Sequence, residues 1–282
     1  REATHKFYVR RQIPPLVLCS PFTYRSFHKP LGYAGDYEMV NMMVRDPYEG
    51  GSLFAKLINH AFLQTAPVVA HRNRIDYLTT KLRAEAERNA MKGRRTRILN
   101  LGCGPAHEVK EFLENEELSD LCDITLLDFN AETIEYTQKE LARVRTQAGR
   151  VTPISLLQRS VHKLLRQATT GDADLKWESF DMVYCSGLFD YLSQRVCRRL
   201  NDLFARLLAP GGLMLVTNVS DTNPSRAWME FVLEWNLIYR DDSAMMEIAP
   251  LNGGQFETAL NRDETGVNLF LEVRKREDHG GI

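Results

Sequence analysis

A short apolar run ends in two glycines at residues 97–104, RILNLGCG. Gly102 and Gly104 carry no side chain, so the backbone there can bend sharply and approach a ligand closely. A second apolar run, residues 123–129, carries Asp128 near its end. A carboxylate at such a position can accept hydrogen bonds from both hydroxyls of a ribose. Together these features predict a binding site for a ligand that contains a nucleoside.

The spacing of the glycines bears on which ligand that is. A dinucleotide site prefers the pattern G-x-G-x-x-G, with a pyrophosphate at the N-terminus of the following helix. In this chain His107 occupies the position of the third glycine. The close packing that a third glycine permits is therefore missing, which argues against an NAD-type oxidoreductase.

The segments around these residues alternate between β-rich runs and amphipathic stretches. Strands are predicted at residues 97–101, 123–129, 154–158, 180–186 and 212–219. Strand–helix alternation predicts a parallel sheet with helices on both faces. Residues 254–275 contain two more β-rich runs with only a polar loop between them, so we expect an antiparallel hairpin at the edge of the sheet.

The first 95 residues lack this alternation. Residues 52–63 place Phe54, Leu57, Ile58, Ala61 and Phe62 on one helical face. Residues 68–90 place Ile75, Leu78 and Leu82 on another apolar stripe. Both segments are predicted to be helices that precede the sheet.

Composition narrows the functional class further. The chain has 282 residues and a formal net charge of −1, so no bulk field attracts it to nucleic acid or to an anionic membrane. Its apolar runs are too short to span a bilayer, and we expect no stable membrane insertion. The five cysteines include no C-x-x-C pair, so we expect no metal site. Unpaired cysteines of this kind are typical of reduced thiols and a cytoplasmic protein.

Four ordered motifs resemble those of class I S-adenosylmethionine-dependent methyltransferases: LNLGCGPAHEV, LLDFN, FDMVYCSGLFDYL and LLAPGGLMLVTNV. The resemblance covers about residues 97–275. It implies S-adenosyl-L-methionine as cofactor and a Rossmann-like, doubly wound α/β fold. We therefore expect a seven-stranded, mostly parallel sheet with an antiparallel C-terminal edge strand, plus an N-terminal helical extension. The implied domains are a helical cap at 1–95 and a methyltransferase domain at 96–282, with a helical insertion at 222–250 near the acceptor pocket.

The same resemblance implies roles for individual residues. Asp128 would hold the ribose, and Phe129 would lie against the adenine. The remaining contacts implied by the motifs are Gly102, Cys103 and Gly104 at the methionine part, Ser160 and Val161 beside the adenine, and Ser186, Gly187 and Leu188 at the sulfonium.

Three other segments carry a narrower resemblance: FHKPLGYAGDYEMVNMM, AHRNRIDYL and SGLFDYLS. They are similar to bacterial proteins of extracellular-factor 3-hydroxypalmitate methyl ester biosynthesis. This resemblance implies carboxyl O-methylation of a 3-hydroxy fatty acid or a related acyl compound, and hence a lipid-like small-molecule acceptor. The alternatives are N- or O-methylation of another class of small molecule, an oxidoreductase, and a protein that binds the cofactor without catalysis. The sequence leaves the oligomeric state open.

The N-terminal segments add candidate residues. Gly32 and Gly35 permit a loop that closes over the cofactor, with Tyr37 at the cofactor and Tyr33 at the substrate. Arg74 can pair with a carboxylate, either the cofactor's or an acceptor's.

Fewer residues in the sequence indicate where the acceptor binds. Trp228 and Trp235 recur at helical spacing and would suit an acceptor pocket. A carboxylate acceptor is nucleophilic without a base, whereas a neutral hydroxyl needs one. Candidates for that base are His71, Asp36 and Tyr191.

Overall fold

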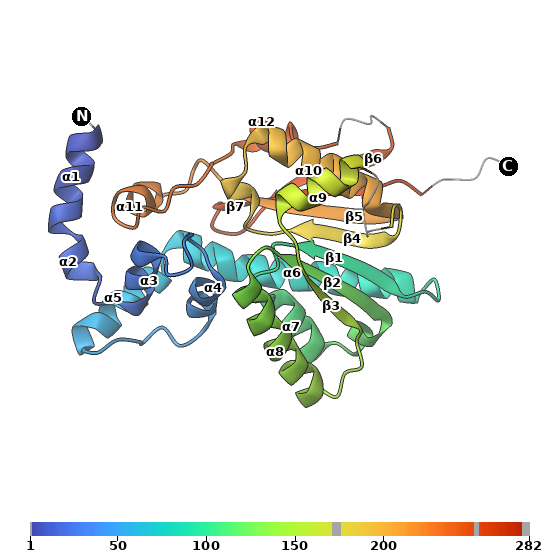
Figure 1. Ribbon diagram of the computed structural model, residues 1–282, viewed down its shortest axis with the longest axis horizontal. Coiled ribbons are helices and arrows are strands. Elements are labelled where there is room, and N and C mark those ends of the chain that lie inside the picture. The colour runs from blue at the N-terminus through green and yellow to red at the C-terminus, as the bar shows by residue number, and fades with distance from the viewer. Residues whose placement is uncertain (1, 171–175, 251–253, 278–282) are drawn as a thin grey trace.

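The computed structural model describes residues 2–170, 176–250 and 254–277. Within these ranges seven strands form one sheet in the order β3-β2-β1-β4-β5-β7-β6 (Figure 1). The strands are β1 (Thr96–Leu101), β2 (Cys122–Asp128), β3 (Ile154–Gln158), β4 (Phe180–Cys185), β5 (Leu208–Val219), β6 (Phe256–Arg262) and β7 (Asn268–Lys275).

The first five strands are parallel, and β7 runs antiparallel to both of its neighbours. The predicted mostly parallel sheet with an antiparallel C-terminal edge is confirmed. The hairpin folds back so that β7 pairs with β5 and β6 forms the edge. β5 begins four residues before the predicted start at residue 212, because Leu208 already pairs with Phe180 ahead of an irregularity in register.

Helices precede the sheet and connect its strands. Those before β1 are α1 (Glu2–Gln12), α2 (Pro14–Val17), α3 (Pro21–His28), α4 (Tyr37–Val44), α5 (Leu53–Leu63) and α6 (Ala66–Ala90). Those after it are α7 (His107–Asn115), α8 (Ala131–Gln147), α9 (Val161–Thr170), α10 (Gln194–Leu207), α11 (Arg226–Phe231) and α12 (Asp242–Met246), with 3₁₀ turns at η1 (Glu117–Leu121) and η2 (Phe189–Tyr191). Among the helices in the described ranges, none combines the length and apolar character needed to cross a bilayer.

Alternating apolar side chains of the strands build a core on each face of the sheet. On one face α6, α7 and α8 pack through residues such as Leu82, Phe112 and Leu141. On the other face α9, α10 and α12 pack through residues such as Leu164, Phe204 and Met245. Figure 1 shows α7 and α8 on the opposite side of the strands from α10 and α12. This arrangement is the expected doubly wound, Rossmann-like fold.

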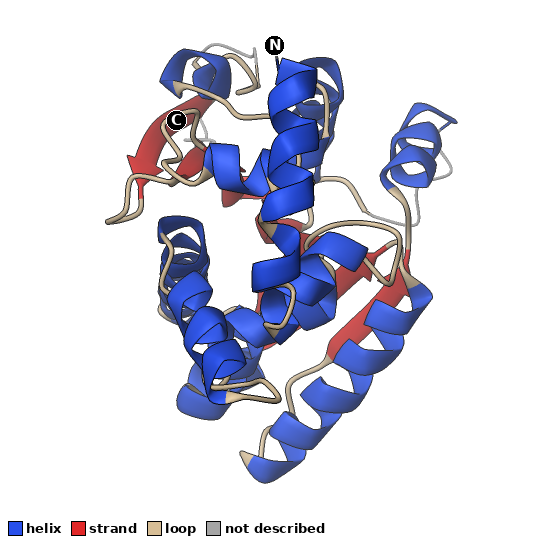
Figure 2. Ribbon diagram, turned by 90° about the vertical axis from the view of Figure 1, so that its left-hand side faces the viewer, coloured by secondary structure: helices blue, strands red, loops and turns tan. Residues whose placement is uncertain are grey.

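A separate apolar cluster joins the N-terminal helices to the segment after β5. Phe22, Met39 and Leu63 come from the N-terminal helices, and Val232 and Leu233 come from the chain beyond α11. Figure 2 shows the N-terminal helices in front of the strands, when the molecule is viewed from the side that is on the left in Figure 1. Two segments about 200 residues apart in sequence therefore form one structural unit beside the sheet.

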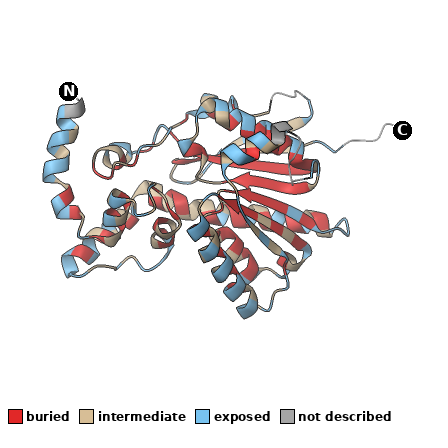
Figure 3. Ribbon diagram, viewed as in Figure 1, coloured by how far each residue is buried: buried red, intermediate tan, exposed pale blue. Residues whose placement is uncertain are grey.

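The helix predicted at 52–63 forms, but the side chains that it buries are not those that the apolar periodicity predicts. Ala55, Asn59 and Leu63 are buried, whereas Phe54 and Leu57 are more than half exposed. Asn59 determines this orientation because its amide oxygen accepts hydrogen bonds from Ser20 Oγ and from the Phe22 backbone. A buried polar side chain needs such partners. The pale blue residues of α5 in Figure 3 mark the exposed side.

This orientation predicts unequal effects of two leucine substitutions in one helix. Leu63→Ala should lower the free energy of unfolding by about 2–5 kcal/mol, because it leaves a cavity. Leu57→Ala should change it by less than about 0.5 kcal/mol, because Leu57 is 54% exposed. Urea unfolding followed by circular dichroism measures both. Equal losses of unfolding free energy in the two variants would mean that α5 buries the apolar face that contains Leu57.

Candidate functional site

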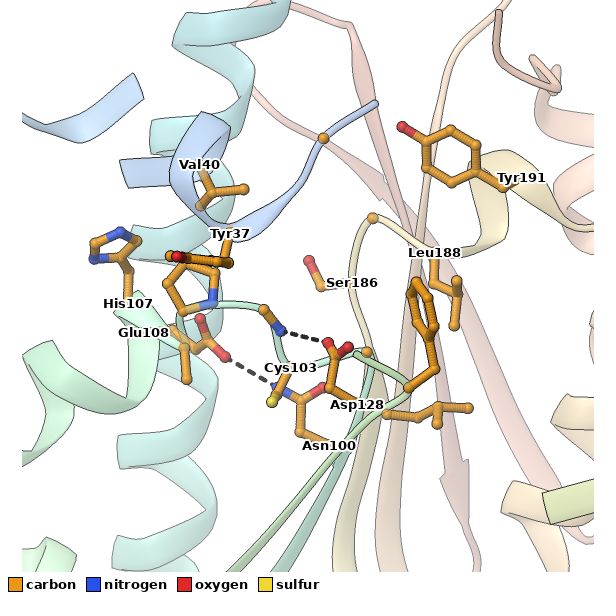
Figure 4. Close-up of a pocket in the computed structure, with 18 of the residues that line it drawn as sticks. Tyr37, Val40, Asn100, Cys103, His107, Glu108, Asp128, Ser186, Leu188 and Tyr191 are labelled. Carbon is orange, nitrogen blue, oxygen red and sulfur yellow. Dashed lines mark hydrogen bonds between the residues drawn. The ribbon is translucent and has the colours of Figure 1, made fainter. Parts of the chain in front are cut away.

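A cavity of about 340 Å³ lies at the carboxyl ends of β1 to β4. Loops after these strands form its floor, and the segment before α4 together with α6 forms its other walls. Figure 4 shows Cys103, Asp128 and Ser186, which follow or end β1, β2 and β4, around one space with Tyr37 of α4. All of the residues expected to contact the cofactor line it: Gly102, Cys103, Gly104, Asp128, Phe129, Ser160, Val161, Ser186, Gly187, Leu188, Tyr37 and Arg74.

The glycine loop crosses from β1 to α7 under a steric constraint. Gly102 has a φ of +73°, and a β-carbon there would lie 3.3 Å from the side chain of Leu188. The backbone N–H groups of Gly102 and Cys103 both donate to the carbonyl oxygen of Leu127, at 2.7 and 3.0 Å. The loop is thus fixed to the end of β2, and its remaining surface faces the cavity.

Asp128 holds the same loop through its side chain. One carboxylate oxygen accepts the N–H of Gly104 at 3.1 Å, and the other accepts the N–H of Asn130 at 3.0 Å. Asn130 in turn caps α8 by accepting the N–H of Thr133. Burial raises the pKa of Asp128, and these backbone donors act in the opposite direction. Each oxygen retains a lone pair that a ribose hydroxyl can use.

Glu108 is a cavity residue that the sequence reasoning did not single out. Its carboxylate accepts hydrogen bonds from Asn100 Nδ2 at 3.1 Å and from the Tyr184 hydroxyl at 2.9 Å. Burial raises its pKa, and the charge of Arg74 acts to lower it. The sequence feature that could have indicated Glu108 is its position in the first helical turn after the glycine loop. Glu108 and Arg74 are two oppositely charged groups of the cavity lining, which also includes Asp128 and Arg159.

The loop before α4 covers the cavity, which Tyr33, Ala34 and Gly35 help to line. The rings of Tyr33 and Phe129 lie 5.1 Å apart, centre to centre. Tyr37 stacks on Tyr136, and its hydroxyl donates to Glu132 at 2.8 Å. Burial is the main cause that raises the pKa of Tyr37 to about 12, so its hydroxyl keeps its proton. These contacts hold the loop against α8.

Asp36 does not join this site. Its Oδ1 accepts the N–H of Met39 as the N-cap of α4 and also accepts Arg25 Nε, both at 2.9 Å. The side chain is buried and lines neither the first cavity nor its neighbour. The expectation that Asp36 acts as a base is therefore not supported by its position, because helix capping and an ion pair engage it elsewhere.

A second, smaller cavity of about 90 Å³ adjoins the first. Its walls are mostly apolar side chains from α3, α4, α5 and the segment after β5. Both predicted tryptophans, Trp228 and Trp235, line it. They do not share a helical stripe, since α11 ends at Phe231 and the chain turns at Glu234, where φ is +51°. Residues common to the two cavities are Gly35, Val40, His71, Arg74, Gly187 and Tyr191.

Arg74 and His71 lie at the junction of the two cavities. Arg74 Nη2 is 2.7 Å from His71 Nδ1. A guanidinium can only donate, so Nδ1 must be the unprotonated ring nitrogen. Burial, and secondly the charge of Arg74, lowers the pKa of His71 well below its usual range, so the ring is neutral with its proton on Nε2. That nitrogen is buried and has no protein partner. His71 thus presents a donor, which does not fit the expected role of a base.

The hydroxyl of Tyr191 also has hydrogen-bond partners within the protein. Its hydroxyl donates to the Ala34 carbonyl at 3.1 Å and accepts from Trp235 Nε1 at 2.7 Å. Burial raises its pKa, so it is poorly suited to remove a proton. Its contacts instead connect the covering loop to the segment after β5.

Asp190, which sequence reasoning missed, lines the second cavity and accepts the N–H of Val219.

Comparison with known proteins supports this arrangement. A family model described as a methyltransferase domain matches residues 92–262. No curated protein sequence matches the chain. Among solved structures, a possible exported protein from Bordetella parapertussis has a TM-score of 0.67 at 15% identity, covering 98% of this chain and 97% of that one.

Two solved methyltransferases share the fold at low identity. Magnesium protoporphyrin IX methyltransferase from Synechocystis PCC 6803, with bound S-adenosylhomocysteine, has a TM-score of 0.54 at 10% identity, covering 96% of this chain and 99% of that one. The CurJ carbon methyltransferase has a TM-score of 0.55 at 11% identity, covering 98% of this chain and 72% of that one.

The residues present fit the cofactor of that family. Gly102 and Gly104 have positive φ and open a backbone cradle, and Asp128 offers carboxylate oxygens at its edge. Glu108 places a carboxylate in the same cavity, where it could accept from the amino group of a ligand. The chain belongs to the methyltransferase-domain family and is an S-adenosylmethionine-dependent methyltransferase.

Proposed function

We propose that the protein transfers a methyl group to the carboxylate of a small acceptor with an apolar body. The observation that carries this proposal is the position of Arg74. Among the described residues its only hydrogen-bond partner is His71, and none of them forms an ion pair with it. Arg74 lies between two cavities with no carboxylate in ion-pair contact, and the carboxylates of Asp190 and Glu108 act on it only from farther away. This position favours an anionic ligand.

The close packing of Arg74 against the strand end supports the same assignment. A β-carbon on Gly187 would lie 3.1 Å from Arg74 Nη2, so the guanidinium sits directly on the loop after β4. That loop is the one assigned to the sulfonium side of the cofactor. An acceptor carboxylate bound by Arg74 would then lie beside the methyl group, with one oxygen free to react.

The chemistry requires little of the protein beyond placement. When bound, the cofactor supplies an activated methyl group that transfers in line to an acceptor oxygen. Arg74 and the Nε2–H of His71 orient the carboxylate, and the covering loop excludes water. No proton leaves a carboxylate acceptor, so neither His71 nor Tyr191 needs to act as a base. The residue roles along the cofactor given above belong to this proposal.

The apolar second cavity favours an acyl compound as the acceptor. Its lining includes Phe22, Phe62 and Leu233, which suit a hydrocarbon chain. A 3-hydroxy fatty acid fits this description and agrees with the narrower resemblance.

We propose that residues 1–95 and 222–250 act together as the acceptor-binding cap of a domain at 96–282, and that the protein is cytoplasmic. Residues 1, 171–175, 251–253 and 278–282 of that division lie outside the described ranges.

Asp190 favours a second candidate function, methylation of a neutral hydroxyl or amine. Its carboxylate lies near the charge of Arg74, and burial raises its pKa. A raised pKa would suit a general base. The reaction would then release a proton, which carboxylate methylation does not.

The two functions differ in the stability of the product. With methyl-labelled S-adenosylmethionine, long-chain 3-hydroxy acids should gain a label that escapes as methanol under mild base. Acyl-carrier thioesters, small amines and RNA serve as the other acceptor pools. A base-stable label in any pool would overturn carboxyl methylation. A rate that rises with pH from about 6 to 9 would point to a base, because His71 does not titrate in that range.

Arg74→Gln separates acceptor binding from cofactor binding. It should raise the KM for the acid about 10-fold to 100-fold, because a charge-assisted hydrogen bond is lost. Affinity for S-adenosylhomocysteine, measured by calorimetry, should change far less. Arg83→Gln in the same helix is the control, since Arg83 pairs with Glu116 far from the junction. Weaker S-adenosylhomocysteine binding with an unchanged KM would reassign Arg74 to the cofactor's carboxylate.

Asp128→Ala tests the ribose contact. It should weaken S-adenosylhomocysteine binding by about 1–3 kcal/mol, the usual cost of losing hydrogen bonds to a charged group. Asp123→Ala is the matched control, because Asp123 lies in the same strand, has a side chain that is 41% exposed and pairs with Arg95. Unchanged calorimetric affinity in the Asp128 variant would remove this residue from the site.

A further inference from the structure

The N-terminal helices carry an unusual amount of exposed apolar side chain. In the described part of the protein, half of the large apolar side chains that are exposed lie between residues 7 and 57. Exposed apolar residues are ordinary when they are scattered singly, whereas a concentration of them marks an interaction site. Six of these side chains come from α1, α2 and α5, are 54% to 75% exposed and are called here the outer apolar surface: Phe7, Tyr8, Leu16, Leu53, Phe54 and Leu57.

These three helices lie together at one end of the molecule, away from the strands (Figure 1). The inner side of α1 is attached to the rest of the cap, because Arg10 pairs with Glu234 at 2.8 Å and Val9 packs in the apolar cluster. Phe7 and Tyr8 are 69% and 67% exposed, so they lie on the other side of the helix. The aromatic side of α1 therefore faces solvent.

Helix α5 contributes to two apolar environments at once. Phe62 lines the second cavity, and Asn59 is fixed by its buried hydrogen bonds. Leu53, Phe54 and Leu57 are left on the outer side, where Figure 3 shows exposed residues. The outer apolar surface thus belongs to the same helices that build the wall of the second cavity.

The charges on α1 and α5 indicate what covers this surface. Along α5 and over residues 4–12 of α1 every charged side chain is basic, namely Lys6, Arg10, Arg11 and Lys56. Within the described ranges neither Arg11 nor Lys56 has an ion-pair partner, and both are exposed. The net charge of −1 for the whole chain does not reveal this local excess.

Acidic residues near these helices in sequence do not balance that excess. Glu2 is the one acidic residue of α1. Asp46 and Glu49 precede α5, and Glu49 is paired with Arg45. The unpaired charge carried by the two helices themselves, at Arg11 and Lys56, is therefore positive, which complements an anionic surface.

We propose that the outer apolar surface docks on an anionic lipid bilayer. Its aromatic and aliphatic side chains enter the boundary between headgroups and acyl chains, and Arg11 and Lys56 contact the lipid phosphates. A second copy of this chain is a poorer occupant, because the two surfaces would bring like charges together. The docking is peripheral and goes beyond the proposed function without resting on it. It places the cap, which lines the second cavity, against the lipid.

Phe54→Ser combined with Leu57→Ser tests the apolar part of the surface. The full chain is sedimented with vesicles of phosphatidylglycerol and phosphatidylcholine in equal parts. The wild type should bind, and the double variant should lose about tenfold or more in partition coefficient, because less apolar area enters the bilayer. Both side chains are more than half exposed, so the variant should fold, which circular dichroism checks.

The matched control is Met91→Ser combined with Val151→Ser. These side chains are 87% and 77% exposed and lie outside the N-terminal surface, at the end of α6 and before β3. The control pair should bind vesicles as the wild type does. An equal loss of binding in both pairs would overturn the inference, because it would show that any exposed apolar side chain has the same effect.

Arg11→Ser combined with Lys56→Ser tests the electrostatic part. Binding to the anionic vesicles should fall about tenfold, and the wild type should bind pure phosphatidylcholine vesicles much less well. Lys139→Ser combined with Arg199→Ser removes the same charge from α8 and α10 and should have little effect. An equal loss in this control would mean that net charge, rather than the outer apolar surface, attracts the vesicles and would refute the docking site.

Sedimentation velocity without vesicles distinguishes the remaining occupant. A wild type that ignores vesicles but self-associates, and that becomes monomeric in the Phe54 and Leu57 variant, would assign the surface to a second copy and overturn lipid docking. A wild type that neither binds vesicles nor self-associates would also overturn it. The vesicles contain no acid and no cofactor, so a failure of carboxyl methylation leaves this result unaffected.

Discussion

The joined ends of β1 and β2 are the constraint on which the site depends. The Leu127 carbonyl accepts two successive N–H groups of the glycine loop, and Asp128 accepts a third from Gly104. These bonds hold the loop in a position where its backbone forms the floor of the cavity. Any side chain at Gly102 would meet Leu188 and distort this floor. The parallel register of the two strands is what brings the partners together.

The second structural requirement is a cap made from distant parts of the chain. Arg74 and His71 come from α6, Trp228 and Trp235 from the segment after β5, and Tyr191 from the turn after β4. Hydrogen bonds of Tyr191 to Ala34 and Trp235 join the turn after β4 to the loop before α4 and to the segment after β5. Apolar packing between the N-terminal helices and residues 229–235 does the rest. The second cavity exists only where these segments meet.

The electrostatics of the junction follow from one hydrogen bond. Because Arg74 can only donate, it fixes the tautomer of His71 and turns an expected base into a donor. A cation and a neutral N–H then face a space whose other walls are largely apolar. That combination would suit an anionic head group on an apolar body, and Gly187 lies directly against the guanidinium.

The sequence by itself determined the sheet and the cofactor side of the site. Glycines after β1, an acidic residue at the end of β2 and the order of the motifs are local signals, and parallel strands bring their carboxyl ends to one edge whatever the rest of the chain does. Tertiary structure decided the acceptor side. The buried face of α5 follows Asn59 and its distant partners rather than apolar periodicity, and Asp36 is engaged by Arg25 and by helix capping. The tautomer of His71 depends on its hydrogen bond with Arg74, and no local pattern specifies that bond.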